Sequence, residues 1–71
     1  IAINVYSIHM KSRDVIKLLK ADGWQEVHQV GSHKKFAHPT KAGHVVVPHP
    51  KKEIPRGTLR SIEKQSGTKL C

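Results

Sequence analysis

The sequence is poor in residues that cross-link or anchor small proteins. Its 71 residues include one cysteine, Cys71, and only three aromatic residues. A single thiol cannot form an internal disulfide, and it provides no cysteine pair for a structural zinc site. We interpret Cys71 as an incidental free thiol.

Long hydrophobic runs are also missing. Runs such as Val45 to Val47 fall far short of the roughly 20 apolar residues that a membrane helix needs, and no signal-peptide pattern opens the chain. We therefore expect a cytoplasmic protein without a membrane partner. The length fits one domain with a thin core, which leaves no room for a deep cofactor pocket, so no cofactor is expected.

Acidic residues are few. Five Asp and Glu against thirteen Lys and Arg give a formal net charge of +8. Such a surface attracts polyanions without regard to their sequence. On charge alone, the binding partner could be a nucleic acid, an anionic membrane or an acidic protein.

The first nine residues differ from the rest. They are mostly apolar and uncharged, and His9-Met10 is the dipeptide that a common cloning junction encodes. We expect residues 1–9 to be vector-derived and residues 10–71 to form a single domain.

The pattern after Met10 predicts a helix, three strands and a second helix. Ser12 suits an N-cap, Asp14 favours a helix start, and Gly23 suits the stop. The β-strands are expected over 24–30, 33–38 and 44–47, with turns at 31–32 and 39–43. A second helix starts near Pro55 and ends at Gly67. The apolar stripe of the first helix is Val15, Ile16, Leu18 and Leu19, and that of the second is Leu59 and Ile62.

This order predicts an α+β fold, α-β-β-β-α, with a three-stranded antiparallel sheet. Both helices must cover the same face, because neither can bury its apolar stripe otherwise. The other face of the sheet stays open. Trp24 and Phe36 are assigned to the core, since so small a domain with three aromatics needs at least two of them there.

Five histidines follow Met10, and position distinguishes His33 among them. It comes directly after Gly31-Ser32, where a glycine permits unusual backbone angles and a close approach by a ligand. If Phe36 points into the core, alternation places His33 and Lys35 on the open face.

Imidazole suits phosphodiester chemistry. Cleavage of RNA by transesterification needs a base for the 2′-hydroxyl, an acid for the leaving oxygen and a cation for the charged phosphorane. His33 can move a proton, and the cation is left open between Lys34, Lys35, Lys51 and Lys52. His49 lies between Pro48 and Pro50, whose rings stiffen the backbone that presents it. No metal site is expected, because no H-x-x-x-H on a helix and no Cys–His cluster is present.

Three ordered motifs resemble one family. They are S-R-D-V-I-K-L-L-K-A-D-G-W from Ser12, G-S-H-K-K-F-x-H-P-T-K-x-G from Gly31, and V-x-V-P-H-P-K-K-E-I-P-R-G-T-L-R-S-I-x-K-Q-S-G, which ends at Gly67. Together they resemble the HicA toxins of bacterial toxin–antitoxin systems across nearly the whole chain from Met10.

The resemblance implies a fold like that of double-stranded-RNA-binding domains and cleavage of messenger RNA without a metal. It implies that His33, the histidine of G-S-H, is catalytic, and that a HicB-type antitoxin binds the toxin. The residues expected to contact RNA are Ser32, Lys34, Lys35, His49, Lys51 and Lys52.

Two other functions remain open. A non-catalytic double-stranded-RNA-binding module would bind RNA through its lysines and would not need His33. An interaction protein whose charge merely fits an acidic partner would not bind RNA at physiological salt. Shape recognition of RNA gives no reason for an imidazole after a Gly-Ser turn, which favours the enzyme.

Overall fold

The structure, a computed structural model, describes residues 10–70. The order is α-β-β-β-α, as predicted. Residues 1–9 and Cys71 lie outside the described residues, and so do the predictions that residues 1–9 are vector-derived and that Cys71 is a free thiol. The elements are α2 (Ser12–Ala21), β1 (Gln25–Val30), β2 (His33–Ala37), β3 (His44–Pro48) and α3 (Arg56–Ser66).

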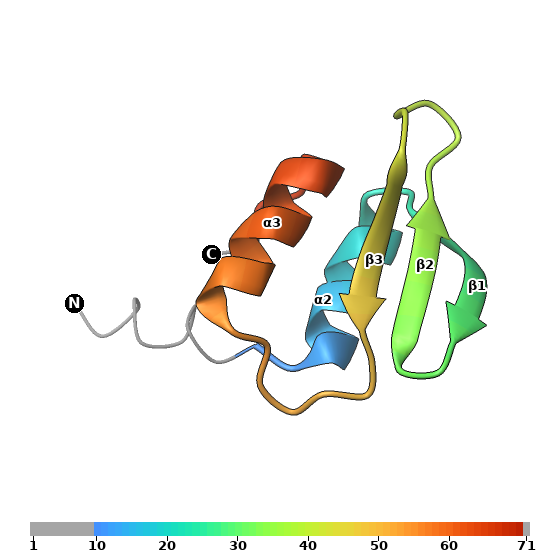
Figure 1. Ribbon diagram of the computed structural model, residues 1–71. Coiled ribbons are helices and arrows are strands. Elements are labelled where there is room, and N and C mark those ends of the chain that lie inside the picture. Colours follow the sequence, from blue (N-terminus) through green and yellow to red (C-terminus); the bar gives the residue numbers. More distant parts are fainter. Residues whose placement is uncertain (1–9, 71) are drawn as a thin grey trace.

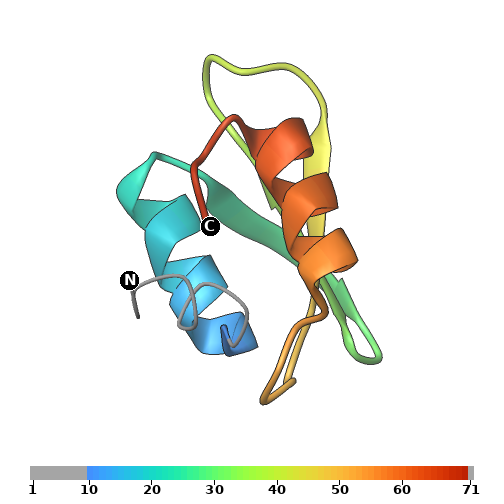
Figure 2. The same ribbon diagram turned by 90° about the vertical axis from the view of Figure 1, so that its left-hand side faces the viewer.

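The three strands form one antiparallel sheet in the order β1-β2-β3. Both helices lie against the same face of the sheet, and the opposite face is open (Figures 1 and 2). This arrangement confirms the predicted layers. It follows from the single apolar stripe on each helix, which has only the sheet and the other helix to pack against.

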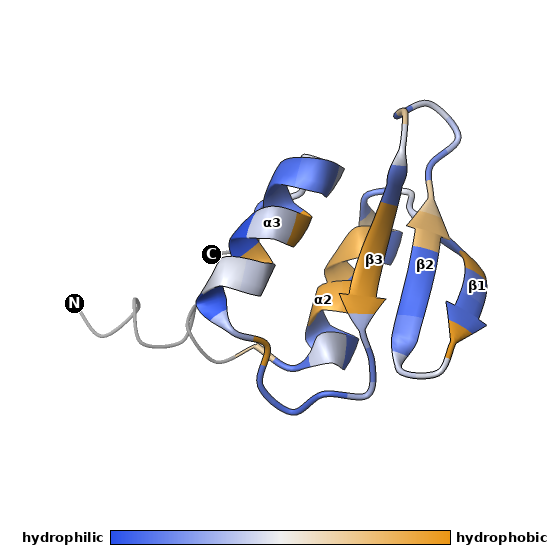
Figure 3. Cartoon of the chain, in the orientation of Figure 1, coloured by the Kyte–Doolittle hydropathy of each residue, from blue (hydrophilic) through white to orange (hydrophobic). Residues whose placement is uncertain are grey.

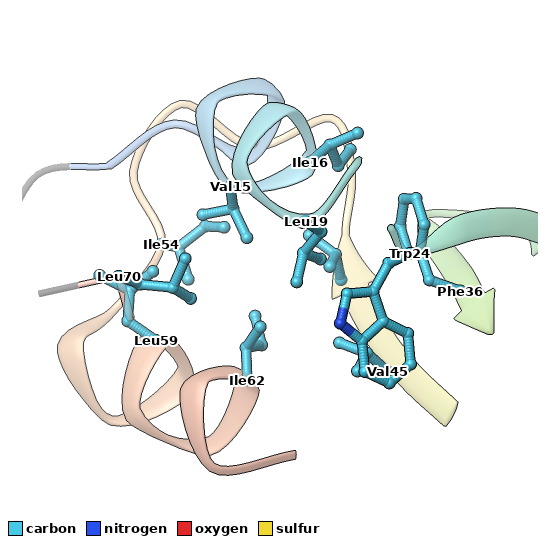
Figure 4. Packing of buried hydrophobic residues seen from close by; sticks show 11 residues of the cluster. Val15, Ile16, Leu19, Trp24, Phe36, Val45, Ile54, Leu59, Ile62 and Leu70 are labelled. Atoms are coloured by element: carbon cyan, nitrogen blue, oxygen red, sulfur yellow. The ribbon is translucent and has the colours of Figure 1, made fainter. Parts of the chain in front are cut away.

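A single apolar cluster fills the space between the helices and the sheet (Figure 4). Trp24 and Phe36 are both in it, with 1% and 0% of their surfaces exposed, which confirms their assignment to the core. Leu18 departs from the predicted stripe, because it is 40% exposed. The buried apolar residues are Val15, Ile16, Leu19, Trp24, Phe36, Val45, Val47, Ile54, Leu59, Ile62 and Leu70.

Strand β1 contributes no buried side chain, since all six of its residues are exposed. Its register with β2 shifts between Glu26 and His28, as at a β-bulge. The helices therefore bury side chains of β2 and β3, and β1 extends the sheet as an edge strand. The sequence of β1, QEVHQV, accordingly has no regular alternation of apolar and polar residues, because a strand exposed on both faces needs no apolar face.

The prediction that Ser12 is the N-cap of the first helix is wrong. The N-cap is Lys11, which makes no side-chain capping bond, and Ser12 is already within α2. The Ser12 hydroxyl instead contacts a loop 37 to 39 residues away in the sequence. As predicted, Gly23 lies just after the end of α2 and Gly67 is the C-cap of α3, and both have a positive φ.

Asp22 connects three segments at the end of the domain where α2 and α3 end. Its Oδ2 accepts hydrogen bonds from Lys41 Nζ at 2.6 Å and from Thr68 Oγ1 at 2.8 Å. Lys41 Nζ also donates to the carbonyl of Ser66. The bond from Lys41, followed by that from Thr68, holds the pKa of Asp22 below its usual value.

We expect Asp22→Asn to weaken the acid sensitivity of the fold. An aspartate whose pKa is lowered by folding stabilises the folded state above its unfolded pKa of about 3.9, and that contribution is lost as the pH falls through the folded pKa. Melting temperatures measured between pH 6 and pH 2 should fall less steeply for the variant, and Lys41→Ala should flatten the curve similarly. Parallel curves for all three proteins would contradict this role of Asp22.

Candidate nucleic-acid interface

Three segments meet at the end of the domain opposite Asp22. They are the β1–β2 turn at residues 31–32, the start of α2, and the loop between β3 and α3, residues 49–55; both views show them at the lower end of the molecule (Figures 1 and 2). The sequence motifs that contain His33 and His49 thus lie at the same end.

His33 lies on the open face of the sheet. Gly31 turns the chain with φ 56°, and His33 is the first residue of β2, opposite Val30 on one side and Pro48 on the other. Phe36 and its partner Val45 are buried, so alternation places His33 and Lys35 on the other face, as predicted. His33 is exposed, and no hydrogen-bond partner for its ring lies among residues 10–70.

The open face combines cationic and apolar groups. Lys35 has His28 as its neighbour on β1 and Val46 as its neighbour on β3. Val46 is 41% exposed, and Val30, beside His33, is 63% exposed. This face therefore offers a polyanion both positive charge and apolar surface.

Lys34 is separated from this group. It pairs with the buried Val47, so its side chain starts on the helix-covered side of the sheet. There its Nζ lies 3.2 Å from Glu26 Oε1, and the side chain is 17% exposed. A carboxylate thus already engages Lys34, one of the four lysines that could assist His33.

His49 is held beside the turn that presents His33. Its backbone N–H donates to the carbonyl of Ser32 at 2.7 Å, and its Nδ1 lies 2.7 Å from Ser12 Oγ. The N–H of Lys51 donates to the same Oγ at 2.9 Å, and the carbonyl of Lys51 accepts from the N–H of Ser12. Four hydrogen bonds thus fix the loop against α2 and the turn.

A pocket of about 630 Å³ opens where the loop meets α2. It contains three of the predicted RNA-contacting residues, His49, Lys51 and Lys52. No local pattern indicated that residues at the start of the first helix would join them, because that contact spans nearly 40 positions. The pocket is lined by Lys11, Ser12, Arg13, His49, Pro50, Lys51 and Lys52.

The other histidines differ from His33 and His49. His38 Nδ1 accepts the N–H groups of Thr40 and Lys41, so its Nε2 carries the proton and donates to the carbonyl of Asp22 at 2.7 Å. Its ring also meets Trp24 edge-on. His38 is a structural residue, and His28 and His44 are exposed on strands.

The hydropathy pattern agrees with this placement. Hydrophilic residues cover the lower part of β2 and the loop between β3 and α3 (Figure 3). Within residues 10–70, no three His, Cys, Asp or Glu side chains gather where they could hold a metal ion. No helix of that part of the chain is long and apolar enough to cross a membrane.

These features define a small basic α-β-β-β-α domain with a histidine on the open face of its sheet. Residues 12–68 match the family model of the HicA toxin of bacterial toxin–antitoxin systems, and the chain belongs to this family. A chain of a solved "HicA3 and HicB3 toxin-antitoxin complex" is similar, with 35% identity and a TM-score of 0.69 over 87% of this chain and all of that one. A search of curated proteins found no match.

Proposed function

We propose that this chain is a metal-independent endoribonuclease that cleaves messenger RNA in the cytoplasm, with His33 as the proton-transfer group. The observation that carries the proposal is the position of His33. It is exposed, it has no partner among residues 10–70, and it lies on the same uncovered face of the sheet as Lys35, at the end of the domain where the loop cations lie. Family membership supports the same activity.

The proposed reaction is transesterification. A base takes the proton of the 2′-hydroxyl, O2′ forms a bond to phosphorus, and the bond from phosphorus to O5′ breaks as an acid protonates O5′. The products are a 2′,3′-cyclic phosphate and a 5′-hydroxyl. His33 moves one of these protons, and Lys35 is the lysine on its face of the sheet that can stabilise the phosphorane.

The direct test uses a mixed-sequence RNA, excess EDTA and the purified chain. We expect cleavage in EDTA and fragments that carry cyclic phosphate ends. RNA that is bound but never cut would favour the alternative, a double-stranded-RNA-binding module, which the fold also suits. Cleavage that stops in EDTA would contradict the metal-independent reaction.

Lys51 and Lys52 are proposed to bind RNA phosphates, together with Ser32, Lys35 and His49. We expect Lys51→Ala/Lys52→Ala to reduce the salt dependence of RNA binding, because each lost phosphate contact lowers the slope of log K against log salt by about 0.7–0.9. The measurement is a binding titration at several salt concentrations in a His33→Ala background, which prevents cutting.

The matched control for this prediction is Lys20→Ala/Lys64→Ala. It removes the same charge from the last turns of α2 and α3, at the other end of the domain. An equal loss of slope in the two double variants would mean that RNA responds only to net charge, against a defined contact at the loop.

The proposed protein partner is a HicB-type antitoxin. The similar solved structure is a complex of HicA3 with HicB3, and the open basic face of this chain would suit a partner with an acidic or apolar surface. Co-purification of this chain with such an antitoxin, and loss of RNA cleavage in the complex, would support that partner.

A further inference from the structure

The hydrogen bonds around Ser12 favour one position for the proton of neutral His49. Ser12 is only 2% exposed, and its Oγ has two partners, the N–H of Lys51 at 2.9 Å and Nδ1 of His49 at 2.7 Å. The Lys51 N–H can only donate, so Oγ accepts from it. The hydroxyl proton of Ser12 then has one acceptor within reach among residues 10–70, which is Nδ1 of His49.

This arrangement favours one tautomer of neutral His49. When Ser12 donates its hydroxyl proton to Nδ1, that nitrogen carries no proton, and the ring proton is on Nε2. If the ring becomes protonated, Nε2 keeps its hydrogen. His49 therefore presents an N–H donor at Nε2 in both charge states, and Nε2 has no lone pair with which to act as a base.

The half-buried ring lines the pocket at the start of α2, and because Nδ1 faces Ser12, the side that remains for the pocket carries Nε2. The charged side chains that line this pocket with His49 are Lys11 and Arg13 at the start of α2 and Lys51 and Lys52 from the loop that carries His49. The backbone N–H of His49 is bonded to Ser32, in the turn before His33. Among residues 10–70, no carboxylate side chain belongs to the lining of the pocket. Four cations around a neutral N–H donor suit a phosphate group.

We propose that this pocket is a second phosphate subsite of the RNA-binding surface, in which His49 Nε2–H donates to a phosphate oxygen and Ser12 holds the ring in that tautomer. The proposal rests on the proposed function for the identity of the ligand. It gives the two histidines at this end of the domain different roles: His33 moves a proton, and His49 binds the RNA backbone.

The geometry places this subsite next to His33 along the chain and in space. His33 is paired with Pro48, the residue before His49, and Ser32 is bonded to the N–H of His49. An RNA strand with one phosphate at His33 can place a neighbouring phosphate in the pocket. Such a contact is made in the ground state and the transition state alike, so its loss raises KM more than it lowers kcat.

The first experiment measures the tautomer by long-range ¹H–¹⁵N NMR of the whole chain at pH 8, where an ordinary imidazole is neutral. We expect His49 in the Nε2–H form and a loss of this single form in Ser12→Ala. Titration with inorganic phosphate should shift the signals of His49, Lys51 and Lys52, and RNA should compete for them. A proton on Nδ1 of His49, or no response to phosphate and RNA, would overturn the proposal.

The second experiment compares His49→Ala with His49→Gln, whose amide nitrogen keeps a donor at the place of Nε2. RNA affinity is measured with each His49 variant made in the His33→Ala protein. We expect His49→Ala to weaken RNA binding about tenfold, as for loss of one hydrogen bond to a charged group, and His49→Gln to weaken it little. In the active chain, the change should appear in KM. His44→Ala, on an exposed histidine at the far end of β3, is the control and should match the parent.

The outcomes distinguish this proposal from the proposed function. Equal damage by the two His49 variants, with a fall in kcat and the loss of one limb of the pH–rate profile, would make His49 a proton-transfer group and overturn the subsite. If the parent cuts no RNA but phosphate and RNA still compete at His49, the ribonuclease proposal fails and the subsite stands.

Discussion

Replacing His33 by alanine is expected to stop RNA cleavage while leaving the fold and the RNA affinity almost unchanged. Proton transfer by a positioned side chain accelerates a reaction by roughly 10²–10⁴-fold, so a loss of that size in kcat is expected. The ring of His33 is exposed and does not contribute to the core. It has no hydrogen-bond partner among residues 10–70, so its removal leaves no group there without a bond. The measurement is a single-turnover cleavage rate, with circular dichroism and RNA binding recorded on the same preparation.

His44→Ala is the matched control for His33→Ala. Both histidines are exposed ends of strands, His33 at the start of β2 and His44 at the start of β3, and they lie at opposite ends of the sheet. If both variants cut RNA as fast as the parent, proton transfer belongs to another group. If His33→Ala loses affinity in proportion to rate, His33 binds RNA and does no chemistry.

Much of the fold could be predicted from single residues with strong backbone preferences. Val45 to Val47 formed the strand that three β-branched residues favour, Pro55 stands at the start of α3, and Gly67 ends it. The side of β2 on which His33 lies also followed from one assumption, that Phe36 is buried. These signals are local, and the structure confirms them.

Features that depend on distant contacts could not be predicted. Ser12 has the residue type of an N-cap, yet its hydroxyl contacts His49, 37 positions away, a partner that no local pattern specifies. Lys34 follows the candidate His33 directly, but the pleat points it away and Glu26 engages it. The sequence therefore predicts which motifs matter, and the fold decides which of their side chains act together.

Gly23→Ala is expected to be far more destabilising than the position of Gly23, half-buried just after α2, suggests. Gly23 has φ 101°, which costs a residue with a side chain about 1–2 kcal/mol. An added Cβ would also lie 2.7 Å from His38 Nε2, the atom that donates to the carbonyl of Asp22. His38 cannot move aside without giving up that bond and the two that its Nδ1 accepts.

Hydrogen bonds of this kind contribute about 1 kcal/mol each, so the three bonds and the backbone strain together cost roughly 4–5 kcal/mol. For a domain of this size such a loss lowers the melting temperature by roughly 15–40 °C, which thermal unfolding followed by circular dichroism would detect.

Gly31→Ala separates the two contributions to that cost. Gly31 also has a positive φ, 56°, but nothing lies within 4 Å of the Cβ that alanine would add. Backbone strain alone should therefore cost Gly31→Ala about 1 kcal/mol, and the difference between the variants measures the clash with His38. Equal losses of stability in Gly23→Ala and Gly31→Ala would show that His38 moves away from the added Cβ at no cost. In that case the contacts of His38 with Asp22 and Trp24 would not hold the end of α2 against the sheet.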